Sequence, residues 1–241
     1  MKIVSPHSSQ RLILGAIISL SLALGARAEV VYSTDFESPA YTAGQAIGTT
    51  SVNGWVGNHN GSSLLVQITD ETSHGGKQCL MEMDQDPSDG PGAWHRFQGR
   101  TLENAEITFY LKLVSEDTAF RVDFADEGHG VTFMIGHGYH PDLGGAGWWV
   151  KPDKGNIISG VADKAVSYNP TAWNKLSFKY NKAENTVALA LNDKEILALS
   201  KAQTEGLILQ GNRFRFVTGW VAGSGANLKA YVDDLVISTN P

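Results

Sequence analysis

The stretch that decides the fold is WNKLSFKYNKAENTVALALNDKEILAL, residues 173–199. Near its start Leu176, Phe178 and Tyr180 alternate with polar residues, which is the period-two pattern of a half-buried strand. Two further apolar runs follow, after the short polar turns NKAEN and NDK. Such turns join neighbouring antiparallel strands. The stretch therefore predicts a three-strand antiparallel meander.

Strand-like runs of the same kind recur along the rest of the chain, separated by turn residues. No window shows the 3.6-residue period of a substantial helix. The predicted strands span residues 30–35, 64–69, 78–83, 105–113, 119–125, 131–135, 148–151, 175–180, 186–191, 195–199, 213–218 and 229–237. The sequence therefore predicts an all-β fold, organised as a single domain over residues 29–241.

The predicted first and last strands carry acidic residues at or near their ends. The first run, VVYSTDFE, holds Asp35 and Glu37, and the last run, YVDDLVI, holds Asp233 and Asp234. A chain that begins and ends on strands suggests that these strands pair and cover each other's edges. Because neighbouring residues on a strand face opposite sides, only one of Asp233 and Asp234 is expected to join a shared site.

Several features together resemble the concanavalin A-like and laminin-G-like jelly rolls of secreted bacterial proteins. They are Trp173 at a strand start, the alternating strand after it, the pair Leu191-Asn192 before a short return strand, and the acidic terminal strands. The resemblance covers both ends and the last third of residues 29–241. It implies a two-sheet antiparallel jelly-roll β-sandwich, with a concave face that receives a polysaccharide in many relatives.

A structural calcium ion is expected at the terminal strands. The terminal carboxylates repel one another if these strands pair, unless a cation lies between them, and many relatives carry a structural Ca²⁺. This ion takes six to eight oxygen ligands from carboxylates and carbonyls. The predicted ligands are Asp35, Glu37 and Asp233, and the alternative is that these acids are simply solvated.

Residues 1–28 have the composition of a secretory signal peptide. A basic start with Lys2 and Arg11 leads into the apolar run 12–24, and Ala-Arg-Ala at 26–28 is a small-x-small cleavage site. The run is shorter than the roughly 20 residues that a membrane span needs. We therefore expect a secreted or periplasmic domain with no membrane span after cleavage.

The charge of the chain bears on its partners. The whole chain has a net charge of −6, and its first 28 residues contain basic but no acidic residues, so the remainder is more acidic still. Nucleic-acid binding needs clustered Lys and Arg, so this balance argues against a nucleic-acid partner.

The stretch 126–160 interleaves glycine with histidine and aromatic residues and predicts a binding site for a polysaccharide or oligosaccharide. Glycine lets the backbone approach a ligand, and aromatic faces suit sugar rings. Because adjacent strand residues face opposite sides, at least one of Trp148 and Trp149 is predicted to be exposed or to face the ligand. The alternative is a mobile hairpin loop with one tryptophan in the core. The candidate ligand-binding residues are Tyr139, His140, Trp148, Trp149 and Arg215.

Two predicted strands present charged residues on one face and phenylalanines on the other. Arg121 and Asp123 share one face of residues 119–125, and Arg213 and Arg215 share one face of residues 213–218. Such faces can hold an acidic sugar through charge-assisted hydrogen bonds. The alternative is that Arg and Asp simply pair across the sheet.

The charged faces also resemble jelly-roll polysaccharide lyases, in which an Arg neutralises the uronate and a Tyr or His pair moves the proton. That resemblance makes His95, Arg121, His137 and Tyr139 the catalytic candidates. However, the strand signatures of alginate lyases are missing from the sequence. The paired carboxylates of jelly-roll glucanases, which retaining hydrolysis needs, are missing as well.

Three functions stay open at this point. The first is a secreted polysaccharide-binding jelly roll without catalysis. The second is a polysaccharide lyase, or less readily a hydrolase, acting on an acidic glycan, and the third is an envelope protein-interaction module. Convergence of Arg121, Arg215, His95 and His137 in one cleft would favour the lyase.

Overall fold

A computed structural model describes residues 28–61, 63–85, 90–97, 100–116, 118–126, 128, 130–219 and 228–239. The predicted signal peptide, except for its last residue, lies outside these described residues. Within the described ranges, no helix is long and apolar enough to cross a membrane.

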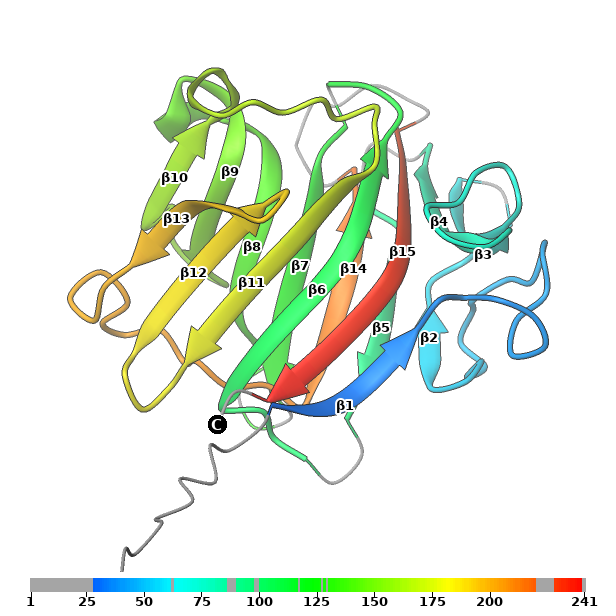
Figure 1. The fold of residues 1–241 in the computed structure, drawn as a ribbon, viewed down its shortest axis with the longest axis horizontal. Helices are drawn as coiled ribbons and strands as arrows, with labels where there is room; N and C mark the ends of the chain where they lie inside the picture. Colours follow the sequence, from blue (N-terminus) through cyan, green and yellow to red (C-terminus); the bar gives the residue numbers. More distant parts are fainter. Residues whose placement is uncertain are drawn as a thin grey trace, which may run out of the picture.

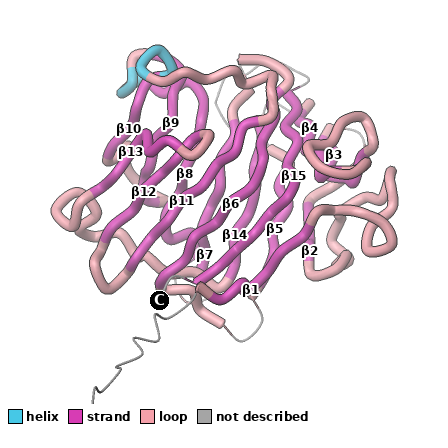
Figure 2. Tube along the Cα trace, in the orientation of Figure 1, coloured by secondary structure: helices cyan, strands magenta, loops and turns pink. Residues whose placement is uncertain are grey.

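Two antiparallel sheets pack face to face as a β-sandwich, which appears as two layers of arrows in Figure 1. Figure 2 shows that strands and loops make up almost all of the described chain. Its helical parts are two short 3-10 turns, η1 (Pro141–Leu143) and η2 (Asp163–Ala165). The all-β sandwich predicted from the sequence is confirmed.

The described strands form one sheet of eight and one of seven. The eight-stranded sheet runs in the order β13 (Lys194–Leu199), β12 (Thr186–Leu191), β11 (Asn174–Asn181), β6 (Asn104–Leu113), β15 (Leu228–Thr239), β4 (Cys79–Asp84) and β3 (Leu64–Thr69), with β1 (Glu29–Thr34) also paired to β15. The seven-stranded sheet runs in the order β10 (Ser159–Ala162), β9 (Gly145–Pro152), β8 (Gly130–His140), β7 (Phe120–Asp126), β14 (Arg213–Thr218), β5 (Gly92–Arg96) and β2 (Trp55–Gly57).

Every strand predicted from the sequence is present, although several extend further than predicted, β8 most of all. The meander is confirmed, because β12 pairs antiparallel with both β11 and β13. Three strands, β2, β5 and β10, were not predicted. Each has three to five residues and contains a glycine, so its alternation of apolar and polar residues is too short to be recognised in the sequence.

The two terminal strands pair as predicted. Tyr32 of β1 lies opposite Ile237 of β15, and the two strands run side by side in Figure 1. The other half of β15 pairs with β4 instead. The change of partner coincides with a register shift in β15 after Asp233, where Asp234 has a φ of +47°. This bulge interrupts the alternation of side chains along β15.

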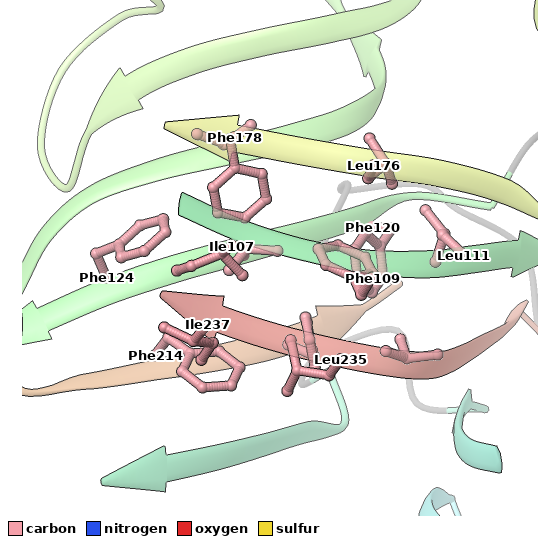
Figure 3. Packing of buried hydrophobic residues seen from close by; sticks show 14 of the residues in the cluster. Ile107, Phe109, Leu111, Phe120, Phe124, Leu176, Phe178, Phe214, Leu235 and Ile237 are labelled. Carbon is pink, nitrogen blue, oxygen red and sulfur yellow. The ribbon is translucent and has the colours of Figure 1, made fainter. Parts of the chain in front are cut away.

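Aromatic side chains fill the space between the sheets, as Figure 3 shows. The ring of Phe109 on β6 lies 5.0 Å from that of Phe216 on β14 and 6.0 Å from that of Phe120 on β7. Strand β6 alternates between buried and half-buried residues, because its other face meets solvent. Strand β7 is buried at every position, so the outward-facing residues of this central strand are shielded as well.

Candidate ligand-binding site

The outward face of the seven-stranded sheet carries a row of charged and aromatic side chains. Phe214 and Phe216 point into the core, so Arg213 and Arg215 point outward from the same strand. The register places Arg215 opposite Trp94 on one side and Asp123 on the other, and Arg213 opposite Arg96. Residues directly opposite each other share a face. The face therefore brings together side chains from β5, β14 and β7.

Asp123 lies at the centre of this face, between two arginines. Its Oδ1 is 2.7 Å from Nε of Arg121, and its Oδ2 accepts hydrogen bonds from Nε of Arg215, at 3.0 Å, and from Nη2 of the same guanidinium. Asp123 is 1% exposed and Arg121 is 7% exposed. Burial lowers the pKa of Arg121, and the neighbouring Asp123 opposes this shift. A buried ion pair of this kind needs both partners, because removal of one leaves an uncompensated charge in the interior.

A cavity of about 170 Å³ opens beside this cluster. Its described lining consists of Trp94, Asp123, Ala125, Val131, Arg213, Phe214 and Arg215. Arg213, Arg215 and Trp94 are only partly buried, so a guanidinium and an indole face remain accessible to a ligand. The two arginines outnumber the single carboxylate, which gives the cavity a positive charge.

Four of the five arginines of residues 29–241 lie on strands β5, β7 and β14 of this sheet, and the fifth lies in the turn after β5. They are Arg96, Arg100, Arg121, Arg213 and Arg215. A planar guanidinium binds a carboxylate or sulfate through two parallel hydrogen bonds, which a lysine ammonium cannot do. An acidic protein thus presents a local arginine-rich face.

Neither Trp148 nor Trp149 is exposed, although at least one of them was predicted to be exposed or to face the ligand. The two side chains do face opposite sides of β9, but they are 2% and 3% exposed. Trp148 packs in the core beside His137, with ring centroids 4.8 Å apart. Trp149 lies on the outward face across Gly136, where an added Cβ would stand 2.1 Å from Cζ2 of the indole. The missing side chain of Gly136 thus provides the space that buries Trp149.

The four catalytic candidates do not converge. Arg121 is on the outward face, whereas His95 and His137 point into the interior and are 7% and 0% exposed. His95 stacks on Tyr32 at 3.9 Å between ring centroids, and burial lowers its pKa to about 4. Residues of opposite parity cannot share a site across one sheet. Arg121 therefore lies on the opposite side of the sheet from His95 and His137, and the convergence that would favour a lyase is not found among these three residues.

Tyr139 and His140 lie at the end of β8, away from the arginine-lined cavity. Tyr139 is 59% exposed, the largest exposed fraction among the aromatic residues described. His140 accepts a hydrogen bond from the backbone N–H of Asp142 at 3.2 Å, and its ring lies 6.2 Å from that of Trp149. Of the five predicted ligand-binding residues, Arg215 is the one that lines the arginine-rich cavity.

The structure does not gather the predicted calcium ligands Asp35, Glu37 and Asp233 into a cluster of three metal-binding side chains. Among the described residues, no three His, Cys, Asp or Glu side chains group closely enough to hold a metal ion. Asp233 accepts backbone hydrogen bonds from His74 at 2.8 Å and Gly75 at 3.2 Å, and Glu37 accepts one from Gln78 at 2.6 Å. Two of the three predicted ligands, Glu37 and Asp233, thus use carboxylate oxygens to accept backbone hydrogen bonds.

The terminal acids instead anchor the loop before β4. Asp234 also reaches this loop, through a 2.6 Å contact with Nδ1 of His74. The expectation that only one of Asp233 and Asp234 joins a shared site is therefore wrong, because the bulge in β15 brings both to the same loop. Gly76 lies in this loop with a φ of +65°, and an added Cβ would stand 2.3 Å from Oε1 of Glu37. A side chain at this position would therefore displace the Glu37 carboxylate.

Comparison with known proteins establishes the fold. A sialidase is similar over 88% of this chain at 12% identity with a TM-score of 0.56, and this chain spans 19% of its length. Cellulose induced protein Cip1 matches over 87% of this chain and 97% of its own, at 16% identity and a TM-score of 0.59. The fold is a concanavalin A-like jelly roll.

A third neighbour is the carbohydrate recognition domain of Emp47p. It matches over 89% of this chain and 97% of its own, at 13% identity and a TM-score of 0.51. No protein-family model matches the sequence, and no curated protein does. At these identities the likeness establishes the fold and leaves the ligand to be argued from the site.

Two features of the site escaped the sequence analysis. Trp94 lies on the short strand β5, which follows a run of Pro, Gly, Ser and Asp that is typical of a loop. The sequence feature that could have predicted β5 is the alternation of Ala93 and His95 with Trp94 and Arg96. Strand β14 has a similar alternation, in which arginines alternate with phenylalanines. The convergence of the arginines needed the strand order, because β5, β7 and β14 are separated in sequence.

Proposed function

We propose that the protein binds an acidic polysaccharide on the outward face of its seven-stranded sheet. The observation that carries this proposal is the concentration of arginines on one side, two of them paired to a buried aspartate, beside a cavity with an accessible indole. Asp123 holds Arg215 at one edge of the cavity, while Arg213 forms no ion pair within the described chain. Uronate or sulfate groups along a polymer would bind these guanidinium groups, and Trp94 would offer a flat apolar face to a sugar ring.

The fold neighbours support a carbohydrate ligand in general terms. One of them is itself a carbohydrate recognition domain, and another is a sialidase. The positions of His95 and His137 favour binding over elimination, because both imidazoles lie on the core side of the sheet while the arginines lie on the other side. A proton-transfer pair is thus separated from the residues that would hold the uronate.

The test is affinity electrophoresis of the full chain in gels containing alginate, polygalacturonate or a neutral cellulose ether. We expect retardation by an acidic polymer that weakens with added salt, since exposed charges are screened. Arg213→Ala should raise Kd about tenfold or more, because hydrogen bonds to charged groups contribute roughly 1.5–3 kcal/mol. Lys194→Ala, which removes the same charge from an exposed site on β13, is the matched control.

Equal retardation by acidic and neutral polymers would contradict the proposal, as would equal effects of Arg213→Ala and Lys194→Ala. The same incubations are followed for the ultraviolet absorbance of unsaturated sugar products. We expect none to accumulate. An increase in this absorbance would contradict binding without catalysis and would support lyase activity instead.

A further inference from the structure

A second cavity lies at the far end of β8 and β9, outside the arginine-rich face. It has a volume of about 380 Å³, within the 300–1,000 Å³ range of small-molecule sites. Its described lining consists of Glu116, Leu143, Gly144, Gly145, Ala146, Ala162, Asp163, Lys164, Tyr168 and Pro170. Residues from η1, η2 and the loops after β6 and β10 thus meet around one hollow.

The carboxylate of Asp163 is held in place by a buried histidine. Nε2 of His137 lies 2.9 Å from Oδ2 and 3.2 Å from Oδ1 of Asp163. His137 is fully buried, whereas the side chain of Asp163 is 30% exposed. The ring of Tyr168 packs 5.0 Å from that of His137. Packing around His137 therefore fixes one carboxylate at the wall of the cavity while leaving part of it open to a ligand.

Other groups around this cavity are available for hydrogen bonds and stacking. The hydroxyl of Tyr168 is buried and has no hydrogen-bond partner within the described chain. Added Cβ atoms at Gly144 and Gly145 would meet nothing within 4 Å, so a ligand can approach the backbone there. Tyr139 is the strand partner of Ala146, which places this exposed aromatic residue beside the lining.

We propose that this cavity binds an uncharged sugar unit, with Asp163, Glu116 and the Tyr168 hydroxyl bonded to its hydroxyl groups. The lining carries two carboxylates and one lysine, so an anionic sugar would meet net repulsion. All five arginines of residues 29–241 lie elsewhere, on or just after the strands of the other site. The sugar hydroxyls would donate to the carboxylates, and the proposal does not depend on acidic-polymer binding at the arginine-rich face.

The test is saturation-transfer NMR on the full chain, with neutral hexoses and their oligomers, glucuronate and glucosamine as separate probes and CaCl₂ as a competitor. We expect a neutral sugar to receive saturation. Tyr168→Phe should raise its Kd about three- to tenfold, the effect of one lost hydrogen bond, and Asp163→Asn should raise it by about tenfold or more. Arg213→Ala should leave it unchanged, which separates this site from the acidic-polymer site.

Several results would overturn the proposal. They are binding of no neutral sugar, preference for glucuronate, glucosamine or Ca²⁺, or equal affinity of the wild-type protein and both variants. Tyr168→Phe removes a hydroxyl without a partner in the described chain and keeps the packed ring. This variant therefore tests the site even if Asp163→Asn fails to fold, and thermal unfolding of each variant checks that point.

Discussion

Replacement of the buried carboxyl Glu82 by Gln should stabilise the protein at neutral and alkaline pH. Glu82 is 0% exposed between the two sheets. Its Oε1 accepts the backbone N–H of Ala93 and its Oε2 accepts the hydroxyl of Thr218, both at 2.9 Å. Burial nevertheless raises its pKa from 4.5 to about 8, and the two hydrogen bonds oppose this shift only in part.

The magnitude follows from proton binding in the two states. Between pH 4.5 and about 8 the folded protein keeps a proton on Glu82 that the unfolded chain releases. The contribution of Glu82 to stability is therefore highest below pH 4.5 and falls by about 1.4 kcal/mol per pH unit across this interval. The loss reaches about 3 kcal/mol at pH 7 and about 5 kcal/mol above pH 8. The amide introduced by Glu82→Gln is neutral throughout, so the substitution removes this loss.

The assay is urea unfolding of the wild-type protein and Glu82→Gln from pH 5 to pH 9. The free energy of unfolding of the variant minus that of the wild type should rise with pH up to about pH 8 and then level off. Taking this difference cancels the contribution of Asp233, whose pKa burial raises to about 6. Glu184→Gln, which changes an exposed carboxylate on a turn, is the control. A difference that does not vary with pH would refute the reasoning.

Two further predictions concern the charged clusters. Asp123→Ala should lower the free energy of unfolding by about 3–5 kcal/mol, because it removes the nearest counter-charge from the buried Arg121. A loss below about 1 kcal/mol in urea unfolding would show that the pair is solvated. Addition of EDTA should leave the melting temperature in scanning calorimetry unchanged, because the carboxylates of Glu37 and Asp233 bind backbone amides. A lower melting temperature, restored by Ca²⁺, would reinstate the calcium site expected from the fold resemblance.

Much of the fold could be predicted because a strand with one buried face has a local pattern of alternating apolar and polar residues. Leu176, Phe178 and Tyr180 alternate with polar residues since one face of β11 is buried and the other is not. The same alternation rule gave the wrong exposure on β9, where both Trp148 and Trp149 are buried. Alternation gives the direction of each side chain, but the burial of Trp149 depends on Gly136 of the neighbouring strand.

The candidate sites were predicted only in part, for the same reason. The shared face of Arg121 and Asp123, and that of Arg213 and Arg215, follow from parity within one strand. Their meeting at one cavity depends on β14 pairing with β7, which no local pattern encodes. Asp163 gave no signal at all, because its partner His137 is 26 residues away and on another element.

The sequence by itself determined most of the strands, the pairing of the ends and the outward direction of the arginines, since these depend on period-two alternation and edge protection. The jelly-roll class came from the resemblance to known jelly rolls. Only the tertiary structure decided which charges meet. Strand order placed Arg215 of β14 beside Asp123 of β7, and the bulge at Asp233 and Asp234 brought both acids to the loop before β4. Contacts between residues distant in sequence are set by the packing of whole sheets, and this packing has no counterpart in any single stretch of the chain.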